Sequence, residues 1–334
     1  MKIGLVYDLK DEYRGLGLDE EALAEFDSAE TIDELAAALT GLGHQLERIG
    51  GTKALARALG EGARFDLVFS IAEGLKGRSR EALAPAVCEL FDQPYCFSDP
   101  LTMALCLDKA MAKRIVRDAG LNTAAFALMQ GASDQAPGFA FPMFVKPVSE
   151  GTGKGCRATS RVNSEPALRE EVARIVKDFS QPALVEQFLP GREFTVGVLG
   201  EGADASVLGV LELIIAPSEA GIYHYANKQS FGDHFDCRLA DDPEAQRAAS
   251  LALEAYRALG CRDVARIDVR ADAHGAPMFL EANPIPGLKP GFSDLCLLAE
   301  MAGKSYGWLI NAIVENAERR IHGARTEPGS ARNR

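Results

Sequence analysis

Four polar side chains near the C-terminal end of the sequence have the types and spacing of a metal and oxyanion site. Arg266 and Asp268 are two positions apart in ARIDVR, and Glu281 and Asn283 are two positions apart in FLEAN. Residues i and i+2 of a β-strand share a face. Two strands joined by a turn at 274–275 would therefore present a guanidinium, two carboxylates and an amide on one side of a hairpin.

Oxygen atoms of this kind suit Mg²⁺, which usually takes one or two carboxylates and completes its shell with water and nucleotide phosphates. Arg266 beside them would stabilise negative charge that develops on a transferred phosphoryl group or an oxyanion. A solvated strand face with salt bridges is the alternative. It does not account for the rigid turn NPIPG at 283–287, which follows at once.

A glycine-rich segment follows another strand-like run and could bind phosphate. Lys146 ends the apolar run FVKP, and SEGTGKG follows at 149–155. Glycines let backbone N–H groups approach phosphate oxygens, and a lysine adds positive charge. The order of residues is not that of a P-loop, and taken alone a glycine-rich hairpin turn explains the segment equally well.

Two further segments could complete a nucleotide site. Lys109 lies at the edge of the apolar stripe of a predicted helix, where it is either a surface lysine that extends toward water or a cation at a cleft. Asp108 beside it could cap a restarted helix. In VEQFLPGRE, Glu186 ends one strand and Glu193 begins the next. Carboxylates in such a connector can accept the protons of a base and a ribose, although surface acids of a hairpin are the alternative.

Composition narrows the class of protein. The formal charge is −12 and no basic stripe is present, which argues against nucleic acid as a partner. Seven cysteines without a CxxC pair favour a reduced, cytoplasmic protein over a disulfide scaffold or a zinc site. No apolar run approaches the roughly 20 residues that span a bilayer, and the N-terminus is typical of a first strand rather than a signal peptide.

The elements that must position these residues begin with a βαβαβ pattern. We predict strands at 2–7, 44–49 and 65–69, with helices at 29–42 and 52–59, and a short strand before Pro100. This alternation predicts a parallel sheet covered by helices. The acidic segment 8–27 is an unusually long connection, either a solvated loop or a lid over a substrate.

The remaining elements predict two smaller α+β units. The first follows a helix at 101–119 and holds strands at 126–129, 141–146 and 183–188 and a helix at 166–179. The second holds strands at 193–199, 206–215, 264–270 and 277–283, a helix at 244–259 and closing helices near 294–302 and 305–320. The chain is therefore predicted to be an α/β protein of three units with joints near 108 and 193.

In this order and spacing the four polar segments resemble the ATP-grasp superfamily and, within it, the D-alanine–D-alanine ligase family. The resemblance covers about residues 65–311 and is strongest at 141–155, 184–195 and 261–287. It implies an N-terminal α/β domain, a central ATP-grasp domain and a C-terminal ATP-grasp domain with the metal site, and ATP held between the last two. The corresponding ranges are 1–108, 109–193 and 194–322, followed by a disordered tail at 323–334.

The resemblance also implies a role for each site residue. For ATP these are Lys109 and Lys146 on the phosphates, the loop residues Glu150, Gly151, Thr152 and Gly153, Glu186 with Gln187 and Leu189 at the base, Glu193 at the ribose, and Lys228 on a mobile loop. Asp268, Glu281 and Asn283 would bind two Mg²⁺ ions, for which Mn²⁺ could substitute. Arg266, the amide of Gly287 and Lys228 would act in catalysis.

The implied reaction joins a carboxylate to an amine through an acyl phosphate, at the expense of ATP. Its partners would be small molecules, amino acids or similar compounds, and the protein would be a homodimer without contact to nucleic acid or membrane. An ATP-grasp ligase of a tailoring pathway with another substrate pair is the first alternative. A regulatory ATP-binding protein without activity is the second, and retention of Arg266 beside the metal residues weighs against it.

Departures from the family pattern gather at the amino-acid positions. The Gly-Gly-x-Ser-x-Glu-like stretch expected after the first strand is replaced by YDLKDEYRGLG, and AEGLKGRSREA at 72–82 replaces a His-Gly and Gly-Glu-Asp-Gly pattern. Thr152 stands for a serine, Gln229 for a tyrosine, and Ser293 lies one position beyond the expected serine. We therefore assign Thr152, Gln229 and Ser293 to the substrate site and expect an altered substrate pair.

Overall fold

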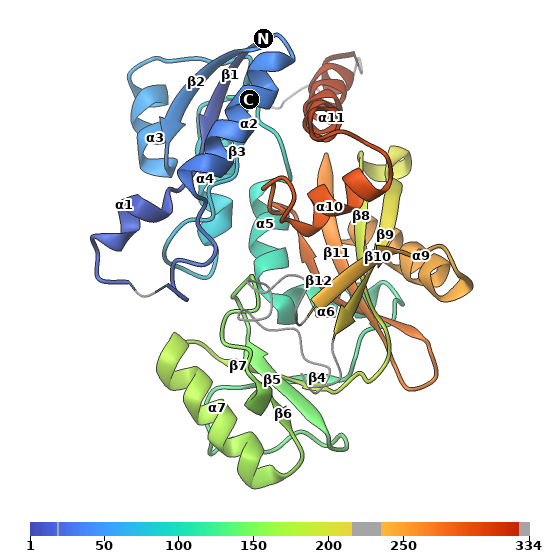
Figure 1. Cartoon of the computed structure of the whole chain (residues 1–334). Helices are drawn as coiled ribbons and strands as arrows, with labels where there is room; N and C mark the ends of the chain where they lie inside the picture. The colour runs from blue at the N-terminus through green and yellow to red at the C-terminus, as the bar shows by residue number, and fades with distance from the viewer. Residues whose placement is uncertain (19, 216–234, 327–334) are drawn as a thin grey trace.

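Three β-sheets organise the chain in the computed structural model, which describes residues 1–18, 20–215 and 235–326 (Figure 1). A three-stranded sheet has the order β2-β1-β3, a five-stranded sheet the order β10-β9-β8-β11-β12, and a four-stranded sheet the order β4-β7-β5-β6. Figure 1 shows them in succession, with the larger sheet between the other two. The predicted α/β class is confirmed.

The N-terminal sheet is parallel, as the βαβαβ pattern predicted. Its strands are β1 (Lys2–Val6), β2 (Gln45–Gly50) and β3 (Leu67–Ser70), and its connecting helices are α2 (Ala29–Gly41) and α3 (Thr52–Gly60). Helix α2 begins after Ser28, whose hydroxyl accepts a hydrogen bond from the Thr31 amide at 3.2 Å. A side-chain cap of this kind satisfies a backbone donor that the first turn leaves free. Helix α4 (Leu83–Leu90) follows β3.

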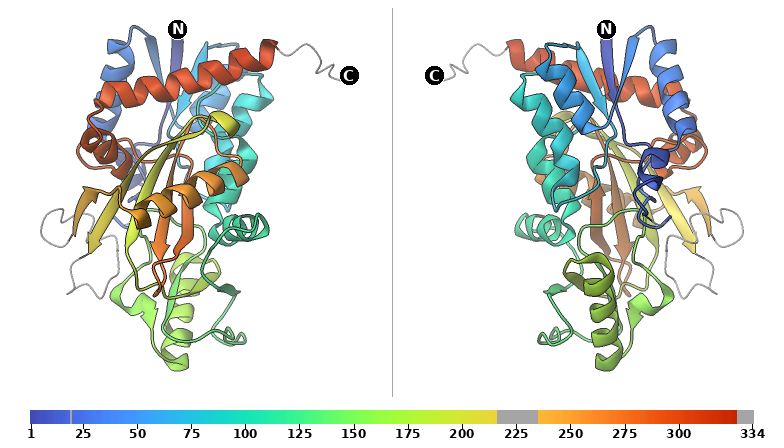
Figure 2. Two further views of the ribbon diagram at one scale, coloured as in Figure 1. Left: turned by 90° about the vertical axis from the view of Figure 1, so that its right-hand side faces the viewer. Right: turned by 90° about the vertical axis from the view of Figure 1, so that its left-hand side faces the viewer.

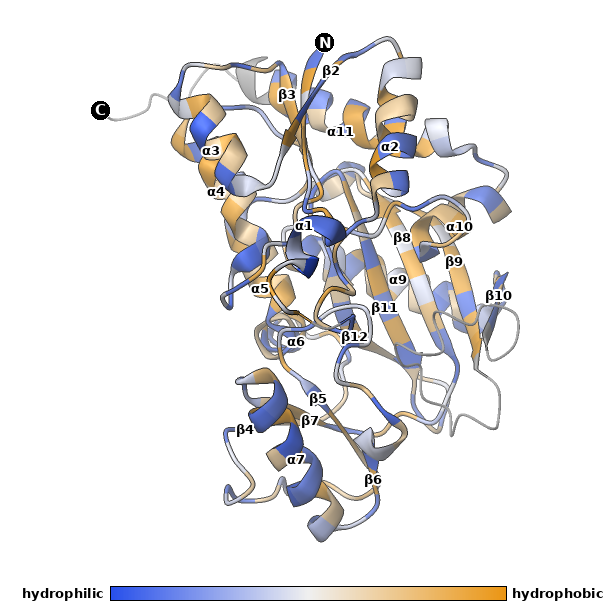
Figure 3. Ribbon diagram, turned by 60° about the vertical axis from the view of Figure 1, so that its left-hand side comes forward, coloured by the Kyte–Doolittle hydropathy of each residue, from blue (hydrophilic) through white to orange (hydrophobic). Residues whose placement is uncertain are grey.

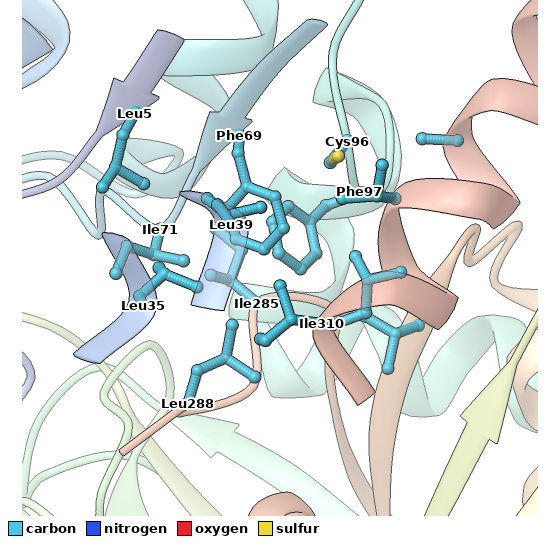
Figure 4. Close-up of a cluster of buried hydrophobic side chains, with 14 of the residues drawn as sticks. Leu5, Leu35, Leu39, Phe69, Ile71, Cys96, Phe97, Ile285, Leu288 and Ile310 are labelled. Carbon is cyan, nitrogen blue, oxygen red and sulfur yellow. The ribbon is translucent and has the colours of Figure 1, made fainter. Parts of the chain in front are cut away.

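The core of the N-terminal sheet includes residues from the far end of the chain. Phe69 of β3 and Leu39 of α2 pack in one buried cluster with Ile285, Leu288 and Ile310 (Figure 4). Ile310 belongs to α11 (Tyr306–Thr326), which lies beside the N-terminal strands in both views of Figure 2. The turn after the predicted metal residues is therefore anchored in the core of the first sheet.

The helix predicted at 101–119 is divided into two helices at Asp108, the residue that could cap a restarted helix. The chain forms α5 (Pro100–Leu107) and then α6 (Lys109–Asp118), with a break at Asp108, whose ψ is 91°. The Asp108 carboxylate accepts a hydrogen bond from the Met111 amide at 3.0 Å and so caps α6. An aspartate competes with the helical backbone for hydrogen bonds, and here it restarts the helix and makes Lys109 a first-turn residue.

The four-stranded sheet is small and antiparallel. It consists of β4 (Phe126–Met129), β5 (Met143–Pro147), β6 (Arg161–Val162) and β7 (Ala183–Gln187). Helix α7 (Glu165–Phe179) packs on it through Leu168, Val172 and Ile175, which lie in one cluster with Val145 and Val185. One face is thus covered by a helix, and the ends of β5 and β7 bring Lys146 and Glu186 together.

The five-stranded sheet is antiparallel in the described strands. It consists of β8 (Glu193–Leu199), β9 (Ser206–Ile215), β10 (Phe235–Leu239), β11 (Val264–Ala271) and β12 (Pro277–Asn283). Helices α9 (Pro243–Ala258) and α6 share its core, α6 through Ala112 and Val116. Helix α10 (Asp294–Met301) packs near β9. Hydrophobic and hydrophilic residues alternate along β11 (Figure 3), so one face packs in the core and the other carries polar groups.

Two further segments differ from the prediction. The strand expected before Pro100 is reduced to a single bridge between Val68 and Tyr95, and Phe97 with a φ of 73° interrupts extended pairing. The segment expected as a long loop contains α1 (Lys10–Arg14) and buries Leu23 and Phe26. Short 3₁₀ turns occupy Arg80–Ala82, Ala158–Ser160 and Gly202–Asp204. No helix within the described ranges is long and apolar enough to span a membrane.

Candidate active site

The pairing of β11 with β12 brings the four polar residues together as the sequence predicted. Arg266 lies opposite Asn283 in the antiparallel register, and Asp268 lies opposite Glu281. Ile267, between the two polar positions of β11, is fully buried in the core of the sheet. The alternation of the strand therefore fixes the polar side chains on the face away from that core.

Asp268 is held by three donors. Its carboxylate accepts hydrogen bonds from the Thr195 hydroxyl at 2.8 Å, from Arg266 at 2.9 Å and from the Asn283 amide nitrogen at 3.2 Å. Burial raises the pKa of Asp268 to about 6, and Glu281 nearby adds to the effect while Arg266 opposes it. The geometry of this carboxylate is fixed before any ligand arrives.

Glu281 faces more positive charge than Asp268 does. Lys109 lies 3.4 Å from its carboxylate and Arg266 lies 3.9 Å away on the other side. Burial alone would raise the pKa of Glu281, but Lys109, Lys146 and Arg266 outweigh it and lower that pKa to about 2. Glu281 is therefore ionised throughout the neutral range, as a cation ligand must be.

The donor set on this hairpin fits a magnesium ion. It offers two carboxylates and the amide oxygen of Asn283, whose nitrogen is already bonded to Asp268. Such a set leaves most of the shell to water and phosphate, as is usual for Mg²⁺. In the part of the chain that the structure describes, no group of three or more His, Cys, Asp or Glu side chains converges on a common point, so a carboxylate-rich cage is not the type of site present.

A cavity between the two antiparallel sheets unites most of the residues predicted from the four segments. Those that line it are Lys109, Lys146, Glu150, Thr152, Gly153, Glu186, Gln187, Leu189, Glu193, Arg266, Asp268 and Glu281. Residues from five stretches of sequence thus share one space. Its mixture of lysines with a glycine-rich loop and a paired carboxylate hairpin is suited to a polyphosphate and a metal.

Glu186 is neutralised by two lysines. Its carboxylate lies 2.6 Å from Lys113 and 2.8 Å from Lys146. Burial would raise the pKa of Glu186, but the two lysines outweigh it and lower the pKa to about 2. Lys113 was missed by sequence reasoning; it follows Lys109 by one helical turn on α6, so the i, i+4 spacing was the signal that could have identified it.

The glycine-rich loop contacts the N-terminal segment in this structure. The amide of Gly151 donates to Glu25 at 2.6 Å, and the amide of Gly155 donates to Glu21 at 2.9 Å. The ammonium of Lys109 donates to the carbonyl oxygen of Glu150. The sequence predicted that amides of the glycine-rich loop would be free to bind phosphate. In the structure two of these amides donate instead to carboxylates of the segment 8–27.

Arg80 strengthens the contact between the N-terminal segment and the glycine-rich loop, because it binds both. Its guanidinium lies 3.1 Å from Glu25 and donates to the carbonyl oxygen of Ser149 at 2.8 Å. Lys154 adds an ion pair to Glu25 at 3.3 Å and one to Glu150 at 2.5 Å. Sequence reasoning missed Glu25 and Arg80, because neither belongs to a recognisable motif.

A second cavity adjoins the first and is lined by the other predicted site residues that the structure describes. Gly151, Thr152, Asn283, Gly287 and Ser293 line it, and Arg266 and Thr152 line both cavities. A Cβ atom on Gly287 would lie 2.8 Å from the Ser293 hydroxyl, so a side chain at this position would displace that hydroxyl. The Ser293 hydroxyl in turn accepts a hydrogen bond from the Lys289 amide at 3.0 Å.

The structure leaves two of the predicted site residues undescribed and gives others an ion-pair partner. Lys228 and Gln229 lie outside the described residues. Glu193, predicted at the ribose, forms an ion pair with Arg270 at 2.8 Å. Asp294 was missed; it lies directly after Ser293 and forms an ion pair with Arg266 at 2.9 Å, so the guanidinium is positioned by carboxylates on two sides.

Comparison with known protein families identifies about three fifths of the chain. Residues 115–315 match the family described as D-ala D-ala ligase C-terminus. The chain is 38% identical over 267 residues to a D-alanine–D-alanine ligase of Bordetella petrii, a match that covers 78% of each protein. It is 34% identical over 302 residues to an uncharacterized protein of Sinorhizobium fredii, covering 87% of this chain and 88% of the other.

Solved structures show the same fold. The D-alanine–D-alanine ligase of Bacillus anthracis complexed with ATP superposes with a TM-score of 0.73 at 20% identity, over 97% of this chain and 99% of the other. The VanG D-Ala:D-Ser ligase of Enterococcus faecalis gives a TM-score of 0.71 at 20% identity, over 95% of this chain and 99% of the other. Both similarities extend over nearly the whole chain.

Proposed function

This chain belongs to the D-alanine–D-alanine ligase family of ATP-dependent ligases that form C–N bonds, and we propose that it joins a carboxylate to an amine through an acyl phosphate, with Mg²⁺ as the metal. The observation that carries the proposal is the hairpin of β11 and β12. There Arg266, Asp268 and Glu281 converge, and Lys109 and Lys146 line the same cavity, with the Lys109 ammonium 3.4 Å from the Glu281 carboxylate.

The first step of the proposed reaction transfers the γ-phosphoryl group of ATP to the substrate carboxylate. The carboxylate oxygen forms a bond to phosphorus, the bond to the β-phosphate oxygen breaks, and ADP leaves. Lys109 and Lys146 would neutralise charge on the phosphates, because both ammonium groups are buried and point into the cavity. Mg²⁺ held by Asp268, Glu281 and Asn283 would supply further charge neutralisation.

The second step releases phosphate. The neutral amine nitrogen attacks the acyl carbon and a tetrahedral oxyanion forms. The bond from this carbon to the phosphate oxygen then breaks, inorganic phosphate leaves, and the nitrogen loses a proton to solvent as the amide is completed. Arg266, which lines both cavities, and the amide of Gly287 would stabilise the oxyanion. Enclosure by the glycine-rich loop would keep water from the acyl phosphate.

Two readings of the substrate remain within this reaction. The named relatives are D-alanine–D-alanine ligases, which makes a pair of amino acids the first proposal. A different pair is the second, and the contents of the cavity that holds Gly287 and Ser293 favour it, because several carboxylates line that cavity. Assembly as a homodimer stays a prediction of the family resemblance.

Release of ADP that depends on the amine and carboxylate substrates tests the proposal. We expect Glu281→Gln to lower kcat by at least ~10³ because the ionised ligand opposite Asp268 is lost. The matched control is Glu254→Gln, a change at an exposed position of α9, which should retain the wild-type rate. Wild-type ADP production by Glu281→Gln at saturating Mg²⁺ would contradict the metal assignment.

A further inference from the structure

Three carboxylates of the N-terminal unit line the cavity on the far side of Arg266. They are Asp27, Glu73 and Glu81, and the cavity also contains Gly287. None of the three makes an ion pair with another residue in the ranges that the structure describes. Glu81 lies within hydrogen-bonding reach of Glu73, and burial raises the pKa of all three acids although Arg80 lowers that of the two glutamates. In this part of the protein these acids are therefore balanced by protons and not by an ion pair.

The cations around the same cavity are already paired elsewhere. Lys10 lies 3.4 Å from Glu20, and Lys289 lies 3.0 Å from Glu30. Arg266 has carboxylates of Asp268 and Asp294 at 2.9 Å. Pairing Asp27, Glu73 or Glu81 with these groups would require existing ion pairs to break.

Glu25, the fourth acid that lines the cavity, differs from these three because cations pair with its carboxylate. It contacts Arg80 at 3.1 Å and Lys154 at 3.3 Å, and it accepts the amide of Gly151. These contacts lower its pKa despite burial. For Asp27, Glu73 and Glu81, by contrast, burial raises the pKa, to about 7 for Asp27 and for Glu81. Arg80 lowers the pKa of the two glutamates but does not overcome their burial.

The three carboxylates are held by rigid elements. Asp27 precedes the capping residue of α2, and its amide donates to the Asp8 carbonyl oxygen at 3.2 Å. Glu81 lies in the 3₁₀ turn that begins at Arg80, which is anchored on Ser149. Glu73 follows β3 by three positions. A preorganised set of acceptors of this kind recognises donors at fixed places.

We propose that this cavity selects a substrate with an additional cationic amino group, the class of diamino acids. The inference rests on the proposed function, because the cavity contains Arg266 and Gly287 and so must hold the reacting groups. An amino acid with one ammonium is neutral overall, so it gives these acids no further cation in exchange for the protons that they hold near neutral pH. A second ammonium group offers three donors and a full charge to the carboxylates.

A divalent metal is a poorer occupant of the three carboxylates. Metal binding requires several oxygens to converge on one point at 2.0 to 2.6 Å, by the usual distances for Mg²⁺ and Ca²⁺. No such convergence of acidic side chains exists among residues 1–18, 20–215 and 235–326. Separate acceptors around a cavity suit a flexible organic cation instead.

Steady-state ADP release with paired substrates tests the inference. Both enantiomers of 2,3-diaminopropionate, 2,4-diaminobutyrate and ornithine would be compared with alanine, 2-aminobutyrate and norvaline, respectively. We expect kcat/KM to be at least ~10-fold higher for one diamino acid than for its monoamino counterpart, since one buried charge contact is worth this much. Glu81→Gln and Glu73→Gln should bring the ratio toward one, whereas the control Glu254→Gln should leave it unchanged.

Binding separates this inference from the proposed function. Isothermal titration of the same compounds would be done on the full chain with Mg²⁺ and a non-hydrolysable ATP analogue, after circular dichroism shows that each variant is folded. ADP release with equal kcat/KM for each pair, or a ratio that Glu81→Gln and Glu73→Gln leave unchanged, overturns the inference and leaves the ligase activity intact. Selective binding of a diamino acid without any ADP release supports the inference and contradicts the proposed function.

Discussion

Neighbouring carboxylates in this site differ because the charges around each one differ. Asp268 and Glu281 are cross-strand partners on adjacent strands, yet burial raises the pKa of Asp268 to about 6, while lysines and Arg266 overcome burial and lower the pKa of Glu281 to about 2. The pair thus holds one fully ionised group and one that titrates closer to neutrality. A cation that binds between them would draw both to the ionised form.

The buried ion pair of Lys113 with Glu186 is predicted to stabilise the folded protein. Its ammonium is fully buried, 2.6 Å from Glu186, and also donates to Thr123 at 2.8 Å. Lys113→Met would leave Glu186 with Lys146 alone and would remove the ammonium that donates to the Thr123 hydroxyl and to the Phe279 carbonyl oxygen. We expect a loss of about 3 kcal/mol in the free energy of unfolding, measured by urea denaturation, because a broken buried pair leaves a charge uncompensated.

The control for Lys113→Met is Lys53→Met on α3, where the lysine is exposed. That change should stay within about 0.5 kcal/mol of wild type, as is usual for surface substitutions. If Lys113→Met were as stable as Lys53→Met, the ion pair with Glu186 would not contribute to folding, and the assignment of Lys113 to the structural support of the site would be wrong.

At the scale of elements, local sequence patterns predicted the contacts within one hairpin but not the contacts between distant segments of the chain. The β11–β12 hairpin was predictable because alternation and a turn fix which side chains share a face. The break at Asp108 was harder, because an aspartate within an apolar stripe is compatible with a continuous helix until its side chain caps the next one. The contact of Glu25 with Gly151 joins residues 126 positions apart, and no local pattern encodes it.

That contact yields a prediction for the glycine-rich loop. Glu25→Gln keeps the size of the side chain but removes the charge that faces Arg80 and Lys154. We expect amide hydrogens of 149–156 to exchange at least ~10-fold faster in the variant, since weakening the contact by about 1.4 kcal/mol raises the open population tenfold. Mass spectrometry of peptides from this loop measures the change.

The matched control for the loop is again Glu254→Gln, whose protection at 149–156 should equal that of wild type. Exchange should also be unchanged in peptides from α7 and from the core strands of the larger sheet, because the substitution removes no contact there. Uniformly faster exchange across the chain would indicate global destabilisation and contradict a specific role of Glu25 in holding the loop.

On the scale of the whole molecule, one core joins the two ends of the chain. Leu5 of β1 packs in the same cluster as Ile310 and Ile313 of α11 and Ile285 of the turn after β12 (Figure 4). The turn that places Gly287 therefore depends on the N-terminal sheet. The sequence indicated separate units from the change in element pattern, but shared packing across units needs three-dimensional distances that periodicity does not contain.

Burial of an acidic group in the N-terminal unit predicts how stability depends on pH. Burial raises the pKa of Asp27 to about 7, and Asp8 nearby adds to the effect; an unfolded aspartate titrates near 3.9. Between these values the folded protein holds a proton that the unfolded chain releases. The stabilisation is therefore fully present below about pH 4 and is lost as the pH rises through about 7.

Asp27→Asn removes this titrating group and should make the stability of the folded protein depend less on pH. Between pH 5.5 and 8, without ligands, we expect the melting temperature of wild type to fall by a few degrees more than that of the variant, which corresponds to a difference on the order of 1 kcal/mol. Glu281, with its pKa lowered to about 2, is ionised in both states across this window and adds no slope. Differential scanning calorimetry of the two proteins side by side makes the measurement, and parallel curves would show that Asp27 keeps its ordinary pKa in the folded protein.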